Sequence, residues 1–183
     1  MKLEVIQVGN PILRQTARVL TVDEIQSAEI QQLIELMKTT MYSAPGVGLA
    51  APQIGHSLQL IVIEDKEEYQ RIFSADELQM RKRKPVAFHV IINPKLTVLS
   101  MEHVKFHEGC LSVQGLCGIV PRAAAVKVTG LNDRAEPINI EAEGWYARIL
   151  QHEVDHLNGV LCIDHMDTKT LATHENYQKF WRS

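Results

Sequence analysis

The sequence predicts an α+β protein in which small mixed or antiparallel β-sheets pack around one central helix. Two observations carry this prediction. Several short stretches rich in β-branched and aromatic residues are separated by turn residues, which is typical of antiparallel strands. Residues 145–157 place apolar and histidine side chains on one helical face, which indicates a helix with a buried side.

The N-terminal part is predicted to hold one short strand and one long helix. Residues 5–8 are strand-like, and Gly9-Asn10-Pro11 would end that strand in a turn. Across residues 23–41, apolar side chains recur near the 3.6-residue helical period, with Thr21 or Asp23 available as the cap. We interpret this helix as core packing.

A loop dense in glycine and small residues follows at 44–55, where the backbone could approach a ligand closely. It contains a G-x-G-x-x-A pattern, which nominally matches a dinucleotide-binding fingerprint. That fingerprint requires a strand before it and a helix after it. Here a helix precedes the pattern and Pro52 follows it, so we reject the dinucleotide interpretation.

The middle of the chain is predicted to form the sheets. Residues 60–63 and 88–92 are strand-like and flank a polar segment with room for one short helix. That segment ends in the basic run 81–84, which predicts a solvated surface loop or, alternatively, contact with RNA phosphates. Asn93-Pro94 is expected to turn the chain into further short strands at residues 96–99, 104–106, 119–120, 125–129 and 138–140.

The helix at 145–157 is expected to end at Asn158-Gly159, and a short helix is expected near residues 175–180. Imidazoles on the buried face of a helix need polar partners, and a metal ion would be one. The predicted buried face consists of Trp145, Ile149, His152 and His156.

Composition bounds the class of protein. The length of 183 residues suits one domain, 1–183, and 45% hydrophobic residues with a net charge of -3 exclude a disordered chain or a basic DNA-binding protein. Three scattered cysteines favour a reducing compartment over a disulfide framework. Residues 1–20 lack the features of a targeting peptide, and the apolar runs are too short for a membrane span, so we expect no membrane partner.

The most informative segment is an H-E-x-x-H motif. On a helix, His152 and His156 lie one turn apart on the same face, so both rings can reach one metal ion, while Glu153 points toward a bound water. The motif predicts a metal-dependent hydrolase. The alternative is an ordinary amphipathic helix with two histidines and a solvated glutamate.

A catalytic site of this kind needs a third protein ligand, and spacing alone leaves three candidates. Cys162 occupies the third-ligand place of an extended H-E-x-x-H-x-x-G-x-x-H pattern, with cysteine in place of histidine. Glu175 lies at a distance that suits a thermolysin-like peptidase. Cys110 is remote in sequence but sits beside a glycine in a loop-like context.

Three segments together resemble the signature motifs of peptide deformylases, in that family's order. They are Gly46-x-Gly48-Leu49-Ala50-Ala51-Pro52-Gln53, Glu108-Gly109-Cys110-Leu111-Ser112 and Gln151-His152-Glu153-x-Asp155-His156-Leu157. The resemblance covers nearly the whole chain. It implies removal of the N-formyl group from the formyl-methionine of nascent proteins, with release of formate. It also implies that Cys110 joins His152 and His156 as a metal ligand, leaving Cys162 as a buried thiol.

The resemblance also implies roles around the metal. Glu153 would act as general base and acid toward the attacking water and the departing nitrogen. The Gln53 amide and the Leu111 backbone N–H would stabilise the oxyanion. The residues themselves suggest the substrate contacts. Val47, Gly48 and Gly109 are expected to bind the peptide through their backbone, since glycine lets a second chain come close, and the metal-facing side of the helix offers Trp145 and Ile149 as walls for the methionine side chain. Asp155 is expected to orient a ligand or to pair with Arg122.

The implied metal is Fe²⁺, with Zn²⁺, Ni²⁺ or Co²⁺ as possible substitutes. The implied partners are formyl-methionyl nascent peptides and, transiently, the ribosome. Three residues, Gln114, Trp145 and Arg148, depart from many bacterial members and resemble the branch that includes mitochondrial ones. We therefore expect a bacterial cytoplasmic protein, or an organellar one whose targeting peptide has been removed. The rivals are a zinc peptidase that uses Cys162 or Glu175, and a non-catalytic module with a structural metal.

Overall fold

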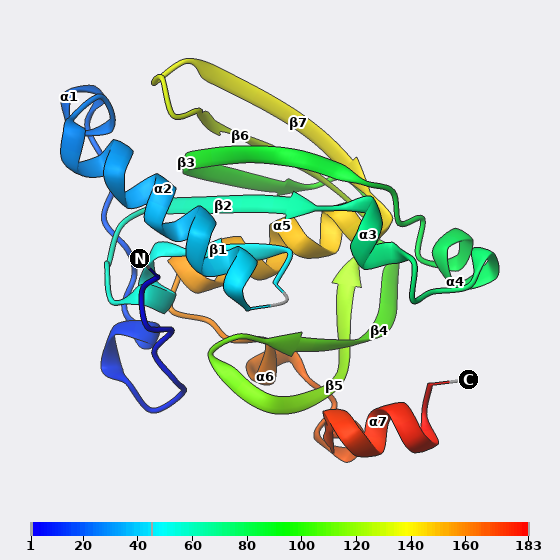
Figure 1. Ribbon diagram of the computed structural model, residues 1–183. Coiled ribbons are helices and arrows are strands. Elements are labelled where there is room, and N and C mark those ends of the chain that lie inside the picture. Colours follow the sequence, from blue (N-terminus) through cyan, green and yellow to red (C-terminus); the bar gives the residue numbers. More distant parts are fainter. Residues whose placement is uncertain (1, 45, 183) are drawn as a thin grey trace.

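A five-stranded antiparallel sheet with the strand order β1-β2-β3-β6-β7 forms the upper layer of the computed structural model (Figure 1). The structure describes residues 2–44 and 46–182, so Pro45 of the glycine-rich loop lies outside the described residues. The strands of this sheet are β1 (Gly48–Ala50), β2 (Leu60–Asp65), β3 (Val86–Val98), β6 (Ala125–Leu131) and β7 (Pro137–Glu143).

A second antiparallel sheet with the order β4-β5-β8 lies below the first (Figure 1). Its strands are β4 (His103–Cys110), β5 (Val113–Ala123) and β8 (Ala172–Thr173). The helices are α1 (Val22–Ile25), α2 (Ala28–Ser43), α3 (Glu67–Gln70), α4 (Ala75–Met80), α5 (Gly144–Leu157), α6 (Cys162–His165) and α7 (His174–Phe180). Short 3₁₀ turns occur at Pro11–Arg14, Ala51–Ile54 and Thr168–Thr170. No helix among the described residues is both long and apolar enough to cross a bilayer.

Helix α5 lies between the two sheets and contacts strands of both (Figure 1). Its apolar side packs against Ile61, Ile63 and Ile91, whereas α2 covers the opposite face of the large sheet through Leu60 and Val62. Because both faces of β2 are covered, its first four residues, 60–63, are continuously apolar and do not alternate with polar ones. The predicted α+β fold with antiparallel sheets around a central helix is confirmed.

The N-terminal predictions need two corrections. The helix expected over residues 23–41 is two helices, because the Ser27 hydroxyl accepts a hydrogen bond from the Ile30 N–H and starts α2 anew. Residues 5–8 form no strand. The Ile6 N–H donates to the Gln53 carbonyl and the Val8 N–H to the Ser112 carbonyl, so the segment bonds to two separate places and builds no ladder.

The expected turn at Asn93-Pro94 is also wrong, because β3 runs through it with an irregularity between Ile92 and Lys95. Asn93 takes a positive φ of 52°, and its side chain pairs with both backbone polar groups of Leu20 at 2.8 and 2.9 Å. At this irregularity in β3, the Asn93 side chain thus makes the hydrogen bonds to Leu20 that the backbone of a neighbouring strand would otherwise make. The glycine-rich loop likewise contains the unpredicted edge strand β1.

The basic run 81–84 is not a solvated loop throughout. Arg83 is buried in an ion pair with Asp65 at 2.8 Å, and the buried Arg81 guanidinium stacks over the ring of Trp145. Lys82 and Lys84 are exposed. The polar segment before this run holds two short helices, α3 and α4, where one was expected. The two arginines of the run are therefore packed inside the protein and are not available for contact with RNA phosphates.

Candidate metal centre

Three potential ligand atoms gather between α5 and the end of β4. The Cys110 Sγ lies 3.3 Å from His156 Nε2, which lies 3.2 Å from His152 Nε2. Ligand atoms on a tetrahedral metal with bonds of about 2.0 to 2.3 Å are about 3.3 to 3.7 Å apart. The two histidines are one helical turn apart, and the β4–β5 register shifts between Gly109 and Cys110 at the end of the strand. The donor set and its spacing fit one divalent metal ion.

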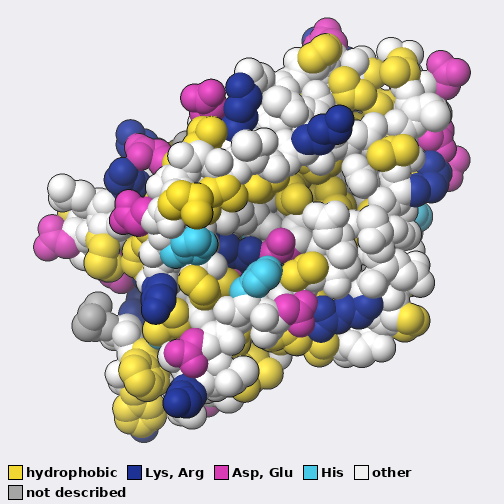
Figure 2. Space-filling model, turned by 180° about the vertical axis from the view of Figure 1, so that it is seen from behind, with side chains coloured by type: hydrophobic (Ala, Val, Ile, Leu, Met, Phe, Trp, Pro, Cys, Tyr) yellow, Lys and Arg dark blue, Asp and Glu magenta, His cyan; other side chains and the backbone are white. Residues whose placement is uncertain are grey.

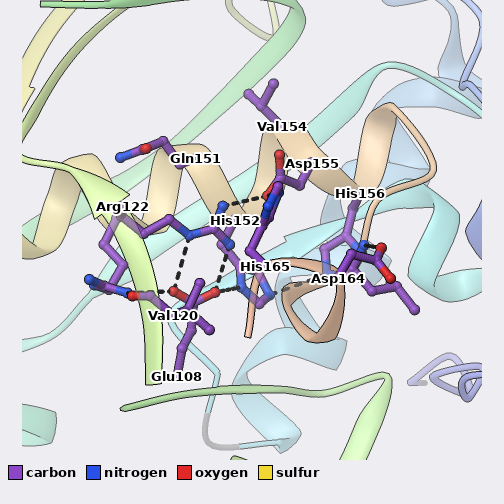
Figure 3. A network of polar contacts seen from close by, with 12 residues as sticks. Glu108, Val120, Arg122, Gln151, His152, Val154, Asp155, His156, Asp164 and His165 are labelled. Atoms are coloured by element: carbon purple, nitrogen blue, oxygen red, sulfur yellow. Dashed lines mark hydrogen bonds and ion pairs between the residues drawn. The ribbon is translucent and has the colours of Figure 1, made fainter. Parts of the chain in front are cut away.

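The Glu108 carboxylate orients the His152 ring of this ligand group (Figure 3). It lies 2.6 Å from Nδ1 of His152, so that ring nitrogen donates to Glu108 and Nε2 is left for a metal. Glu108 also accepts from Arg122 at 2.7 Å and from Arg148 at 2.8 Å. Arg122 in turn pairs with Asp155, which confirms the contact expected from the sequence. The result is a buried polar network that fixes one histidine ring.

The same contacts set the protonation of the site. Burial would raise the pKa of Glu108, but His152 and Arg122 outweigh it and hold that pKa far below its ordinary value. Burial opposes the charged form of His152, yet the Glu108 carboxylate raises its pKa to about 9. The neighbouring Cys162 thiol and burial raise the pKa of Cys110. Metal binding must therefore displace protons, and metal affinity should fall as pH falls.

Replacement of Glu108 by glutamine should both destabilise the fold and loosen the metal site. The variant leaves the buried Arg148 without its carboxylate partner and removes one of the two carboxylates that pair with Arg122, a loss that typically costs about 3 to 5 kcal/mol. Losing a partner that orients a ligand typically lowers metal affinity about 10- to 100-fold. Urea unfolding and metal titration at pH 7 measure the two effects.

The pH dependence of unfolding provides the control for this variant. A carboxyl group whose pKa is lower in the folded protein stabilises the fold at pH values above its unfolded-state pKa of about 4.3. That stabilisation is lost as the pH falls toward the folded-state pKa. Wild type should therefore lose more of its free energy of unfolding between pH 5 and pH 3 than Glu108→Gln does. Equal losses in the two proteins would contradict the paired state of Glu108.

Glu153 stands beside the ligand group without belonging to it. Its side chain is 4% exposed, and its Oε2 has no hydrogen-bond partner among the described residues. Burial raises the pKa of Glu153 to about 7, which suits an acid–base group at neutral pH. A Cβ at Gly48 would collide with this carboxylate. The glycine therefore makes room for Glu153 beneath β1.

The orientation of the Gln53 amide follows from its hydrogen bonds. Its Oε1 accepts from the Ala50 N–H at 2.9 Å, so the amide nitrogen must point the other way. That nitrogen lies 3.6 Å from the Cys110 Sγ and 3.3 Å from the Ser112 hydroxyl. The buried amide thus aims its N–H groups at the ligand end of the site.

These groups line one cavity of about 320 Å³. Figure 2 shows the hollow, with basic and acidic groups inside and histidine side chains at its border. His156 is buried behind the cavity and does not line it. The other residues expected to bind the metal, the oxyanion or the substrate in a deformylase, together with the expected base, all line it: Val47, Gly48, Gln53, Gly109, Cys110, Leu111, Trp145, Ile149, His152 and Glu153.

Comparison with known proteins agrees with this geometry. The family model described as polypeptide deformylase matches residues 2–172. The chain belongs to the polypeptide deformylase family. Peptide deformylase 1A of Solanum lycopersicum is 46% identical over 173 residues, which are 94% of this chain and 62% of that protein. The mitochondrial peptide deformylase of Homo sapiens is 40% identical over 168 residues, 92% of this chain and 69% of that one.

Solved deformylase structures match as well. The class I type b peptide deformylase of Acinetobacter baumannii, crystallised with Met-Ala-Ser, has a TM-score of 0.80 and 34% identity, and the match covers 91% of this chain and 99% of that one. The chain spans 62% and 64% of the length of two plant relatives, which is less than two thirds. Deformylases depend on a metal, in agreement with the Cys/His group found in this chain.

The rival ligands occupy different places in this deformylase fold. Cys162 is buried and forms a second potential group with Glu108 and His152. Glu108 is already engaged by two arginines, which makes that group a poor cation site. Glu175 is exposed on α7 and belongs to neither group.

Sequence reasoning missed the network around Glu108 and two cavity residues, His107 and His174. Glu108 carries a usable signal, because it lies two residues before the candidate ligand Cys110. Arg148 was noted only as a departure from bacterial members, yet its guanidinium pairs with Glu108 beside the cavity. The two histidines carry no such signal, since only the folded chain brings them to the cavity.

Proposed function

We propose that this chain is a peptide deformylase, and that residues 1–183 form one catalytic domain that removes the N-formyl group from formyl-methionyl nascent peptides. The observation that carries the proposal is the shared cavity. Cys110, His152, Glu153 and Gln53 line it, the third ligand His156 is buried beside Cys110 and His152, and Leu111, Trp145 and Ile149 add an apolar lining. This combination suits amide hydrolysis next to an apolar side chain.

The residues divide the chemistry between them. A divalent metal held by the ligand group would supply a Lewis acid and lower the pKa of a water molecule. Glu153 would accept a proton from the attacking water and return it to the departing nitrogen. The amide of Gln53 and the N–H of Leu111 would donate hydrogen bonds to the developing oxyanion. The products are formate and a free amino group. The oxygen of the consumed water molecule ends up in formate, and a proton from it is transferred to the amino group.

The cavity wall suits a methionine side chain followed by extended peptide. Trp145 and Ile149 form the apolar slot, and the charge of neighbouring Arg148 is neutralised by Glu108. Val47, Gly48 and Gly109 would bind the peptide through their backbone groups, as an added strand is bound.

We infer Fe²⁺ as the active metal, with Zn²⁺, Ni²⁺ or Co²⁺ as substitutes, because mixed sulfur and nitrogen ligands suit these ions. The reducing environment that a free thiolate ligand needs would be a bacterial cytoplasm or the interior of an organelle, since relatives of both kinds exist. We expect transient contact with the ribosome from the origin of the substrate alone, because Arg81 and Arg83 are buried.

An anaerobic assay tests the proposed function. Purified protein is loaded with Fe²⁺, its metal content is measured, and formate release from formyl-Met-Ala-Ser is followed. Stoichiometric metal with formate release is the expected result. Bound iron without formate release would exclude the deformylase function and favour the structural-metal module. Cleavage of an unformylated peptide bond would favour the peptidase.

Replacement of Gln53 by alanine should lower kcat by about 10² to 10³, because one donor to the oxyanion is lost. The metal content should be unchanged, since Gln53 is outside the ligand group. Steady-state formate release measures the effect. Gln114→Ala is the matched control, as an exposed glutamine outside the cavity, and should match wild type. A Gln53 variant with wild-type kcat would remove this residue from the oxyanion site.

A further inference from the structure

The C-terminal segment places a histidine at the rim of the cavity. His174 follows β8 directly, and its Nε2 lies 3.0 Å from the point that a Cβ on Gly109 would occupy. A side chain at position 109 would therefore crowd the imidazole. The glycine leaves room for His174 over the end of β4, and both residues line the cavity.

This placement is fixed by the fold. Strand β8 pairs with β5 through Leu116↔Thr173 and Cys117↔Ala172, which carries the chain across to the cavity side of the small sheet. The Tyr177 ring of α7 packs against the His107 ring, with 4.4 Å between centroids and a tilt of 39°. The backbone that carries His174 is thus held by the strand pair before it and by this ring contact after it.

The His174 ring is available to a ligand. The residue is exposed, and within residues 2–44 and 46–182 its ring makes no hydrogen bond or ion pair. An imidazole can donate to a peptide carbonyl or accept from a peptide N–H. A peptide that leaves the cavity past Gly109 can supply the hydrogen-bond partner that the ring lacks among the described residues.

An extended peptide bound in the cavity would continue beyond the methionine side chain. The formyl end must meet the ligand group, and the methionine side chain must enter the slot at Trp145 and Ile149. Extended backbone advances about 3.3 Å per residue, so the third residue lies about 7 Å beyond the methionine. Gly48, Gly109 and His174 line the same cavity as the ligand residues Cys110 and His152.

We propose that His174 binds the substrate beyond its second residue and makes the site favour formylated peptides of three or more residues over dipeptides. This inference rests on the proposed function. It adds a binding contact supplied by the C-terminal segment, which lies outside all three signature motifs.

The test compares His174→Ala with wild type on formyl-Met-Ala and formyl-Met-Ala-Ser, both as C-terminal amides so that no carboxylate confounds the comparison. The loss of one hydrogen bond predicts a decrease in kcat/KM of about 3- to 10-fold on the tripeptide, and less than about 2-fold on the dipeptide. The change should appear in KM, because the contact acts on binding. His174→Gln, which keeps a donor and an acceptor, should recover part of the loss. His56→Ala, at an exposed histidine away from the cavity, is the control.

Equal losses on both peptides would assign His174 a structural role, and no loss on the tripeptide would remove the contact; either result overturns the inference. Should wild type hydrolyse neither peptide, the proposed function fails separately. Calorimetric binding of Met-Ala and Met-Ala-Ser amides then still decides the inference. Weakening by His174→Ala confined to the longer peptide supports it, and any other pattern, including no measurable binding, overturns it.

Discussion

Replacement of Glu153 by alanine is expected to lower kcat for deformylation by about three orders of magnitude and to leave the metal content unchanged. A positioned general base typically contributes about 10² to 10⁴ in rate. Glu153 is outside the ligand group, so the substitution removes a proton acceptor and no ligand. Formate release at saturating substrate measures kcat, and elemental analysis of the same sample measures the metal.

Glu153→Gln is the matched control for packing. It keeps the side-chain volume beside Gly48 but cannot accept a proton at neutral pH. Both variants should lose turnover to a similar extent, whereas the glutamine variant should unfold at nearly the wild-type temperature. An alanine variant that hydrolyses formyl peptides at the wild-type rate would exclude Glu153 as the base.

The pH profile of the wild-type enzyme follows from the same side chain. The carboxylate form of Glu153 is the one that accepts a proton, so kcat/KM should rise with pH through the pKa of this group. Burial raises that pKa to about 7, and a bound cation nearby favours the carboxylate and lowers it. The acidic limb should therefore have an apparent pKa at or below about 7. A limb centred above pH 8 would point to a different base.

The parts of the fold that depend on local pattern are predictable from the sequence. Helix α5 follows from helical periodicity and its Asn158-Gly159 stop, and β2 follows from its apolar run. The i, i+4 spacing of His152 and His156 already implies that both rings share one face. Within the site, the two histidine ligands on the helix and the candidate base Glu153 can thus be predicted from the sequence.

The remaining features depend on contacts between distant segments. Asn93 looks like a turn residue, yet it pairs with Leu20 and lets β3 continue. The run at 81–84 looks solvated, but an aspartate on β2 neutralises Arg83. Glu108 shows its role only once α5 lies over β4, because its partners are 14 to 44 residues away in the sequence. Tertiary neighbours decide these cases, and a local pattern does not contain them.

Replacement of Cys110 by alanine is expected to lower metal affinity by at least about 100-fold. Loss of a residue that merely orients a ligand costs about 10- to 100-fold, and loss of a ligand should cost no less. Two imidazoles would remain, and the thiolate charge that offsets the cation would be gone. Competition with a metallochromic chelator under anaerobic conditions measures affinity without depending on turnover.

Cys162→Ala is the decisive comparison, because spacing along the chain makes Cys162 an equally good ligand. The structure packs both thiols into one buried cluster, so removal of either should cost similar stability. Only Cys110 completes a group with both histidines, whereas Cys162 is grouped with a glutamate that two arginines already neutralise. The two variants should therefore have similar stability, but only Cys110→Ala should bind the metal more weakly than wild type. Metal retained by Cys110→Ala but lost by Cys162→Ala would instead identify the extended H-E-x-x-H pattern as the true ligand set and favour the peptidase.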